Sequence, residues 1–592
     1  MSVSGRERVV TAGASAAGAL LVAGPLLRPG YLLVRDAVST PRSYPTDSAL
    51  GLGDAAPRAV PQDAALAALS TIVDGGLVVK AILVLALWGA AYGAAVLARE
   101  FLRAPIGAQL VAAAVALWNP YVAERLLQGH WSLLAGYGAL PWTVLAANRL
   151  RSTVVPFGKR TGATVSAWAA LSAALAGAGL TPTGALLAGS TALALARRRH
   201  LLATLALWLA TSAPWLAATM LSGAGSEPSD PAGVAAFAAR AEPGLGTLGA
   251  VAGLGGIWNA EAVPYSRTTP LAVIGTCALL AIVALGVRAF AVGGADSDDR
   301  RVRRVLLLLA AIAIAFPALG ATPWGTTLLE QLVTRVPGAG LLRDTQKFVA
   351  LAMPAYAMCA ATGCVVLARR LSTGTGGRRD APRQAAISTV AAVFAAVLIL
   401  PLYDLAWGVS GAVRAVHYPD GWQRVAERMT SGGDVAVLPG GMFRVFHYSG
   451  AVPVLDPAPR MLPNDVLQTG ELPVRGSRVA GEGARAREVE DLLHRGASAT
   501  RLADLGVGWV LVERTTPGPL GDSAGSLARL ELVYQDTDFA LYRVPGPIEW
   551  HGSASTHRAL VWAAHIVWAV ALLTGPCLVL GTRVRSRFGR SR

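Results

Sequence analysis

The chain has 592 residues, of which 53% are hydrophobic and only 15% are charged, and its mean hydropathy is +0.48. A soluble domain carries nearer to a quarter charged residues, so this composition argues against a soluble protein and indicates a membrane protein. The formal charge of +16 would suit nucleic-acid binding, but the positive residues are nearly all arginines in short clusters between apolar segments. Such clusters are typical of membrane topology, and we expect no nucleic-acid partner.

Apolar segments that approach the roughly 20 residues of a spanning helix recur along the chain. They predict a mainly α-helical, polytopic membrane protein with about twelve transmembrane helices. The first follows Arg6 and Arg8, and because no small-residue cleavage site comes after it, we expect a retained signal anchor. The predicted spans are 9–28, 76–98, 104–118, 131–148, 161–180, 184–197, 201–220, 269–291, 305–319, 347–368, 386–408 and 558–581.

Arginine clusters fall in alternate connections between these spans and in the C-terminal tail "TRVRSRFGRSR". By the positive-inside rule, the basic connections and both termini lie in the cytoplasm of a plasma (inner) membrane protein. The longer, less basic connections then emerge on the outer face. They are 29–75, 119–130, 221–268, 320–346 and 409–557.

The largest outer segment predicts a small extracytoplasmic α/β domain. "DVAVLPG" (434–440) and "VGWVLVER" (507–514) are apolar runs bounded by turn residues, as buried strands are. A hairpin is predicted around 536–538, and residues 486–496 have the spacing of a helix that ends at glycine. The predicted organisation is a transmembrane domain (1–408), the extracytoplasmic α/β domain (409–557), and a last helix with a basic cytoplasmic tail (558–592).

An acidic residue follows the first predicted helix closely. Asp36 comes after "YLLV", whose apolar side chains should hold the chain against the membrane face. Asp47 and Asp54, further along, are better explained as solvated loop carboxylates. For Asp36, a solvated carboxylate and a functional group at the membrane surface are equally good interpretations.

Polar residues are dense in the segment 119–131, which holds Asn119, Tyr121, Glu124, Arg125, Gln128, His130 and Trp131. Glu124 and Arg125 could simply pair with each other, and His130 with Trp131 could be an interfacial anchor. Because polar groups at membrane depth cost free energy, their density predicts instead a partly helical outer segment buried in protein.

Positive charge also lies just before the tenth predicted span, against the positive-inside bias. Arg343 and Lys347 are four residues apart and would share one face of a helix. An arginine fork and a lysine point charge suit a phosphate group. The alternative is that Asp344 and lipid phosphates merely neutralise them.

Three stretches carry a family resemblance: "GYLLVRDAV" (30–38), "WNPYVAERLLQGHWSLLAGYGALPW" (118–142) and "PGAGLLRDTQKF" (337–348). In this order, with many spans and a late outer domain, the chain resembles the GT-C superfamily of membrane glycosyltransferases. Within it, the chain is similar to actinobacterial members that are arabinofuranosyl- or mannosyltransferase-like. One departure is that many members carry paired acidic residues in the first loop, whereas Asp36 lies between Arg35 and Ala37.

The resemblance implies an inverting glycosyltransferase that moves a sugar from a polyprenyl-phosphate donor to a cell-envelope glycan or lipid acceptor on the outer face. Asp36 would be the catalytic base. Because Asp36 is a single carboxylate, the case for a bound metal is weaker, and we assign no metal ligand. A divalent cation as cofactor remains an open alternative. The implied substrate-binding residues are Glu124, Arg125, His130, Trp131, Arg343, Asp344 and Lys347.

Two other classes of function remain open. A transporter or flippase of a lipid-linked envelope precursor would also need many spans and polar residues at membrane depth. No internal repeat divides the spans into matched halves, and the polar clusters gather at one face, which counts against transport. A non-catalytic GT-C-like scaffold would use residues 409–557 to bind an envelope partner.

Overall fold

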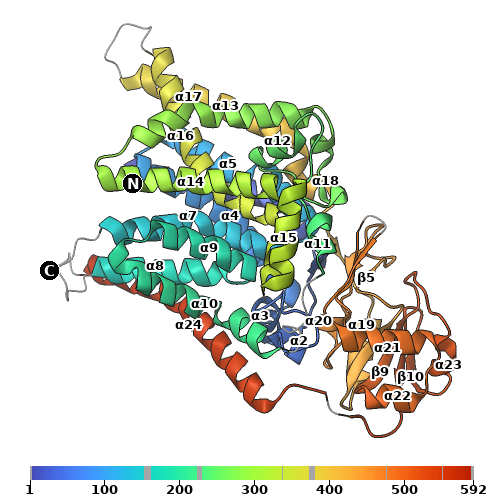
Figure 1. The fold of residues 1–592 in the computed structure, drawn as a ribbon. Coiled ribbons are helices and arrows are strands. Elements are labelled where there is room, and N and C mark those ends of the chain that lie inside the picture. The colour runs from blue at the N-terminus through green and yellow to red at the C-terminus, as the bar shows by residue number, and fades with distance from the viewer. Residues whose placement is uncertain are drawn as a thin grey trace.

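The structure is a computed structural model that describes residues 3–152, 162–222, 230–336, 338–372, 380–474, 477–549 and 551–588. Lys159, Arg160, Arg378 and Arg379, which contribute to the predicted basic loops, lie outside the described residues. A body of stacked helices carries the α/β domain at one end, and both termini lie at the opposite end (Figure 1). This arrangement is the one that the positive-inside rule predicts for cytoplasmic termini and an outer domain.

A helix occupies every segment predicted to span the membrane. These helices are α1 (Val3–Ala23), α4 (Gly75–Leu102), α5 (Ile106–Leu117), α7 (Trp131–Ser152), α8 (Gly162–Ala178), α9 (Pro182–Leu195), α10 (Leu201–Leu221), α13 (Leu271–Val292), α14 (Ser297–Gly320), α16 (Met353–Ser372), α17 (Asp380–Ile399) and α24 (Ser555–Phe588). Nine helical segments among the described residues are long and apolar enough to cross a membrane, and α8 and α9 are shorter apolar helices. The chain is therefore a mainly α-helical, multi-pass membrane protein, and twelve crossings stay a prediction.

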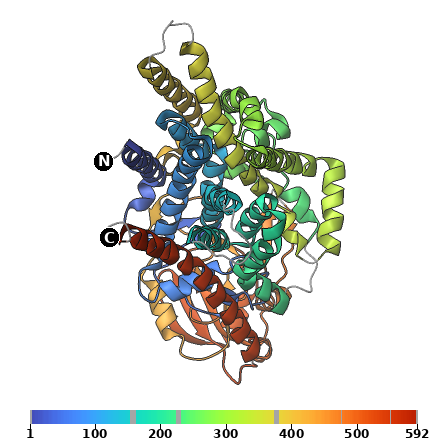
Figure 2. The same cartoon turned by 90° about the vertical axis from the view of Figure 1, so that its left-hand side faces the viewer.

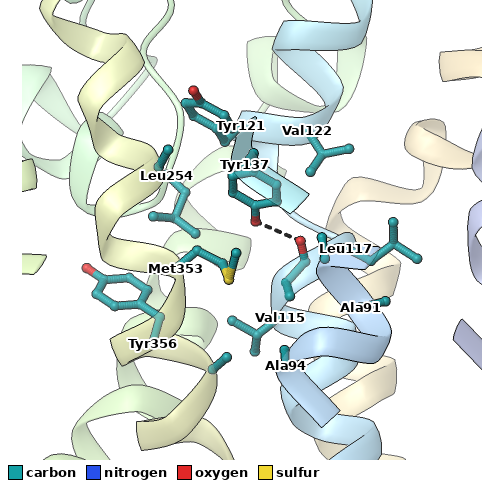
Figure 3. Close-up of a cluster of buried hydrophobic side chains, with 14 of the residues drawn as sticks. Ala91, Ala94, Val115, Leu117, Tyr121, Val122, Tyr137, Leu254, Met353 and Tyr356 are labelled. Atoms are coloured by element: carbon teal, nitrogen blue, oxygen red, sulfur yellow. Dashed lines mark hydrogen bonds between the residues drawn. The ribbon is translucent and has the colours of Figure 1, made fainter. Parts of the chain in front are cut away.

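The centre of the helical body is packed from small and aromatic side chains of α4, α5, α7 and α16. Ala91 of α4 and Val115 of α5 belong to the same buried cluster as Met353 and Tyr356 of α16 (Figure 3). At the end of this cluster, Tyr137 donates a hydrogen bond to the carbonyl oxygen of residue 116 at 2.6 Å. This buried hydroxyl is thus bonded to the protein's own backbone, as a polar group at membrane depth requires.

One helix crossing shows why small residues are needed. A Cβ at Gly286 of α13 would lie 1.9 Å from the carbonyl oxygen of Cys359 in α16. Lipid chains are as apolar as the protein core, so helices in a membrane associate largely through such close packing. The frequent glycine and alanine residues of the sequence serve this purpose.

The polar segment after α5 is a helix, α6 (Pro120–Gln128), and all of its residues are buried. The side chain of Asn119 caps it by accepting the Val122 N–H at 3.1 Å, and Pro120 starts it. Gly129, with φ of +84°, ends it. The prediction of a partly helical segment buried in protein is therefore confirmed for 119–130.

The first outer segment begins with a β-hairpin. Strand β1 (Tyr31–Val34) pairs with β2 (Ala37–Val38), and Val34 pairs with Ala37, so Arg35 and Asp36 form a two-residue turn. Arg35 has φ of +43°, and tight hairpin turns require a positive φ. Strand β1 also pairs with β3 (Ala415–Val416), which opens the region after the eleventh predicted span.

The α/β domain contains a four-stranded sheet in the order β10-β11-β9-β4. Its strands are β4 (Asp434–Leu438), β9 (Val507–Glu513), β10 (Glu531–Gln535) and β11 (Phe539–Arg543). Strands β4 and β9 are parallel, and β10 and β11 form the predicted hairpin with its turn at 536–538. The predicted helix is α21 (Ala484–His494). A small α/β domain before the last helix is therefore confirmed.

The remaining elements connect these parts. In the outer segments they are α2 (Asp47–Leu50), α3 (Gln62–Leu69), α11 (Ala232–Ala236), α12 (Gly246–Ala252) and α15 (Pro323–Arg335). After α17 they are α18 (Ala406–Ser410), α19 (Gly421–Arg428), β5 (Phe443–Arg444), β6 (Val454–Leu455), α20 (Ala458–Met461), β7 (Leu472–Val474), β8 (Ser477–Val479), α22 (Ala499–Asp504) and α23 (Ser523–Leu527). Helix α15 runs across the ends of the other helices, and α24 returns from the α/β domain along α8 and α10 (Figures 1 and 2).

Candidate active site

A cavity of about 1780 Å³ lies between the helical body and the α/β domain. Its lining combines the β1–β2 turn, the start of α7, the segment before α16 and one side of the α/β domain. Of the residues predicted for the site, it is lined by Asp36, His130, Trp131, Arg343, Asp344 and Lys347. The three stretches that are far apart in sequence thus meet at one cavity.

Asp36 presents one carboxylate oxygen to the protein and one to the cavity. Its backbone N–H donates to the carbonyl oxygen of Gln128 at 3.1 Å, which fixes the turn against the end of α6. Its Oδ2 accepts hydrogen bonds from His130 Nε2 at 3.0 Å and from Gln128 Nε2 at 3.1 Å. No described residue donates to Oδ1, and the side chain is 30% exposed. Oδ1 is therefore free to accept a proton.

His130 is held in one tautomer. Arg125 Nη1 lies 3.0 Å from His130 Nδ1, and because a guanidinium only donates, Nδ1 must be the acceptor. The ring proton is then on Nε2, where it is donated to Asp36. Burial lowers the pKa of His130, and its hydrogen bond to Asp36 only partly offsets this effect, so the ring is neutral at pH 7.

The environment keeps Asp36 ionised. Burial acts to raise the pKa of Asp36, but the hydrogen bonds from His130 and Gln128 and the positive charge of Lys347 outweigh burial. The pKa of Asp36 is lowered below its ordinary value as a result. A carboxylate is thus present across the physiological pH range.

A buried ion pair connects this group to the segment before α16. Arg125, which has no exposed surface, donates to Asp344 Oδ2 at 3.0 Å and to Asp344 Oδ1 at 3.3 Å, and also to Gln346. Burial opposes ionisation of Asp344, but the charges of Arg125 and Lys347 lower the pKa of Asp344 to about 2. Lys347 Nζ lies 3.6 Å from Asp344 Oδ2 with its side chain 25% exposed. The lysine is therefore anchored by Asp344 and still reaches the cavity.

Glu124 and Arg125, which were predicted to bind substrate, are fully buried and are not among the residues that line the cavity. Glu124 is fully buried and accepts the backbone N–H groups of Gly256 and Ile257 at 3.1 Å each. That loop carries Asn259, whose Nδ2 donates to Gln128 Oε1 at 2.8 Å. Glu124 thus fixes the loop that orients Gln128, which in turn contacts Asp36.

Arg343 belongs to a different ion pair from Lys347. The 3₁₀ helix η6 (Ala339–Leu342) ends before Arg343, and a second, η7 (Thr345–Ala352), begins after Asp344, so the two cations share no helical face. Arg343 Nη2 lies 3.8 Å from Glu482 Oε1 and its guanidinium lies over the Phe237 ring at 5.7 Å. Both cations line the cavity, but Arg343 lies against the α/β domain.

Gly129 allows the hairpin to approach α6. A Cβ at Gly129 would lie 2.4 Å from both the Val34 carbonyl oxygen and the Ala37 nitrogen, and its φ of +84° suits glycine. Glycine therefore brings the Asp36 turn within hydrogen-bonding distance of Gln128 and His130.

Several residues of the site were not assigned a role from the sequence. Gln128 belongs to the polar segment 119–131, so the density of polar residues there could have indicated its place in the site. Gln346 lies in the charged stretch 337–348 but was given no role, and no local pattern distinguishes Asn259. Arg58 forms an ion pair with Glu482 at 2.7 Å. Arg58 lies in the segment 29–75, whereas Glu482 belongs to the α/β domain. Such pairs become visible only when the chain is folded.

No family model and no curated protein matches the sequence. Solved structures do match. Arabinofuranosyltransferase AftD from Mycobacteria, a mutant solved in two classes, aligns with TM-scores of 0.52 and 0.48 at 16% and 14% sequence identity. These alignments cover 92% and 91% of this chain but 42% and 41% of AftD, so this chain spans less than half the length of AftD. ArnT from Cupriavidus metallidurans, bound to undecaprenyl phosphate, aligns over 91% of this chain and 99% of its own, with a TM-score of 0.44 and 13% identity.

The chain has the GT-C fold. The resemblance found in the sequence is therefore confirmed at the level of fold. The stretches that carry the resemblance, 30–38, 118–142 and 337–348, each contribute residues to the cavity of this GT-C fold.

Proposed function

We propose that the protein is a membrane glycosyltransferase that moves a sugar from a polyprenyl-phosphate donor to an envelope glycan or lipid acceptor at the outer face of the plasma membrane. The observation that carries the proposal is the state of Asp36. Its Oδ2 is held by two N–H donors, its Oδ1 faces a large cavity, and its lowered pKa keeps it ionised. A general base needs this combination of orientation, access and charge.

The residues support a single displacement. Asp36 Oδ1 accepts the proton of the acceptor hydroxyl while that oxygen attacks the anomeric carbon of the donor. The bond between that carbon and the phosphate oxygen breaks, and the phosphate leaves with the electron pair. One base and no enzyme nucleophile lead to inversion of the anomeric configuration.

The leaving phosphate requires positive charge, and Arg343 and Lys347 are among the cations that line the cavity. Lys347 is close enough to Asp36 for its charge to lower the pKa of that carboxyl group. Arg343 lines the same cavity on the side of the α/β domain. Fixed charges in a sheltered cavity stabilise a developing anion more strongly than they would in water. We assign His130 and Trp131 to the cavity wall beside the sugar, and Glu124, Arg125 and Asp344 to positioning.

The position of the cavity supports a lipid-linked donor. The α/β domain, which contributes one wall of the cavity, lies at the end of the helical body that is remote from both termini (Figure 1). With the termini in the cytoplasm, this end faces outward, away from the cytoplasmic pool of nucleotide sugars. A transporter would hold its substrate near the middle of the membrane, so the position also favours transfer over transport.

The proposal is tested by Asp36→Asn in the purified full-length protein, assayed with a series of synthetic polyprenyl-phosphate sugars. The amide keeps the shape but cannot take the proton, so transfer should fall by about 10²- to 10⁴-fold while the yield of folded protein is unchanged. The matched control is Glu471→Gln, which neutralises another carboxylate of the same cavity and should leave transfer near the parent rate. Undiminished transfer by Asp36→Asn would overturn the assignment of the base.

A further inference from the structure

In the proposed reaction Asp36 would lie near the phosphate of the donor, and a carboxylate together with a substrate phosphate is a usual ligand set for Mg²⁺. We infer that this site works without a divalent metal ion and that the ammonium group of Lys347 supplies the charge that a metal would supply. The inference rests on the proposed function, and it specifies the electrostatics of the same site.

The donors around Asp36 do not fit a metal. Its Oδ2 already accepts two N–H groups, from His130 and Gln128. A cation bound at Oδ2 would meet both hydrogens and would have to displace them. Only Oδ1 is free, and in the proposed reaction it must accept a proton, which coordination to a cation would make less favourable.

His130 is equally unable to act as a ligand. A metal needs a lone pair on a ring nitrogen. The Nδ1 lone pair accepts from Arg125 at 3.0 Å, and Nε2 carries the proton that is donated to Asp36. Arg125 is itself fixed by two bonds to Asp344, so this tautomer is locked by a buried ion pair.

The second carboxylate of the site is also occupied. Both oxygens of Asp344 accept from Arg125, and Lys347 Nζ lies 3.6 Å from Oδ2. Across the part of the chain that the structure describes, no three His, Cys, Asp or Glu side chains come together as a metal-binding group. Of the four carboxylate oxygens of Asp36 and Asp344, only Asp36 Oδ1 accepts no bond from a described residue, whereas the positive charge of Lys347 acts on Asp36.

Lys347 has the properties that the role requires. Its side chain is a quarter exposed to the cavity and is anchored by Asp344. Its backbone carbonyl accepts the Tyr121 hydroxyl at 2.9 Å, which ties the start of η7 to α6. The ammonium group is thus held in place before substrate arrives, as electrostatic preorganisation requires.

The test uses full-length protein freed of metal with EDTA and then desalted. Mn²⁺ binding is titrated by electron paramagnetic resonance in the parent and in Asp36→Asn. We expect identical titrations, because Asp36 holds no metal. Stoichiometric Mn²⁺ binding that is present in the parent and lost in Asp36→Asn would overturn the inference.

Transfer is measured on the same preparations. The metal-free parent should transfer sugar at a rate within about twofold of samples given Mg²⁺, Mn²⁺ or Ca²⁺. The transfer rate of Lys347→Met should be about 10²- to 10³-fold below that of the parent, and added metal should not restore it. Lys347→Arg keeps the positive charge, so its transfer rate should be close to that of the parent. The control Arg335→Gln removes another cation of the cavity lining and should behave like the parent.

The two proposals fail in different ways. A rate that EDTA abolishes and metal restores would overturn the metal-free inference and leave the glycosyltransferase proposal standing. A parent that transfers no sugar from any polyprenyl-phosphate donor would overturn the proposed function. In that case the Mn²⁺ titration still decides whether Asp36 belongs to a metal site.

Discussion

His130 Nε2 donates a 3.0 Å hydrogen bond to Asp36 Oδ2, and the opposite nitrogen of the same ring accepts from Arg125 at 3.0 Å. The imidazole therefore joins an exposed carboxylate to a fully buried ion pair. Because the ring proton is committed to Asp36, His130 orients the carboxylate and stabilises its ionised form. This single contact makes the titration of Asp36 depend on Arg125, which does not line the cavity.

Replacing His130 should move the acid limb of the pH profile. Loss of a hydrogen bond to a charged group costs about 1.5–3 kcal/mol, which corresponds to about 1–2 pH units. The donor favours the ionised form, so its removal raises the pKa of Asp36 and the rate begins to fall at a higher pH. The acid limb of the pH profile of kcat/KM should move to higher pH by that amount in His130→Phe. The move should be smaller in His130→Gln, because the amide can still donate a hydrogen bond to Asp36. Superimposable profiles for His130→Phe and the parent would contradict the role.

Stability should also respond to pH through His130. Its pKa is lowered in the folded protein, so below pH of about 6.5 the unfolded chain binds a proton that the folded chain does not. The free energy of unfolding should therefore decrease as the pH falls from 7 to 5. Thermal unfolding in detergent checks this, and His130→Phe should show a smaller decrease than the parent.

Breaking the buried ion pair should be far more damaging than breaking an exposed one. Arg125→Met leaves Asp344 without its buried partner, and such a change costs about 3–5 kcal/mol of unfolding free energy. The matched control is Arg149→Met, whose pair with Glu100 is exposed and is worth about 0–1 kcal/mol. Denaturant unfolding of the two variants should therefore differ clearly. Equal losses of stability would contradict the structural role of Arg125.

Gly129→Ala should disturb the hairpin without removing any polar side chain of the site. A Cβ would lie 2.4 Å from the Val34 carbonyl oxygen, and the positive φ adds about 1–3 kcal/mol of strain. We expect a lower unfolding temperature and reduced transfer. Gly13→Ala is the control, because its Cβ would meet nothing within 4 Å and a helix gains about 0.5–1 kcal/mol from alanine.

The proposed orientation is open to cysteine labelling in intact cells. His447 of the α/β domain has 59% of its side chain exposed, and Arg300 lies at the predicted cytoplasmic start of α14. In a background with Cys277→Ser and Cys577→Ser, a membrane-impermeant maleimide should label His447→Cys and spare Arg300→Cys until the cells are broken. The reverse pattern would place the cavity in the cytoplasm.

Patterns within short segments predicted much of this molecule. Apolar runs predicted the segments that form membrane helices, and bounded apolar runs predicted β4 and β9, because hydrophobic periodicity is a local property. Asp36 was noticed because it follows an apolar stretch closely. The density of polar residues around Glu124 correctly indicated burial in protein.

The failures have physical causes. The expected shared face of Arg343 and Lys347 assumed a regular helix, but the backbone at Asp344 has φ of −90° and ψ of +77° and interrupts it. The contacts of Glu124 with the backbone of Gly256 and Ile257 could not be predicted, because these two residues have no side-chain signature. The wall formed by the α/β domain, with Glu482 between Arg58 and Arg343, depends on contacts between distant segments.

The pairing of β1 with β3 has a consequence for biogenesis. Tyr31 pairs with Val416 and Leu32 pairs with Ala415, so the N-terminal hairpin lacks one neighbouring strand until most of the polypeptide has left the ribosome. The backbone N–H of Leu455 then donates to the Arg35 carbonyl at 2.7 Å, which adds a still later contact. Contacts of such long sequence separation form slowly. A nascent chain truncated before these residues would thus carry its first helices with the Asp36 hairpin still lacking its later partners.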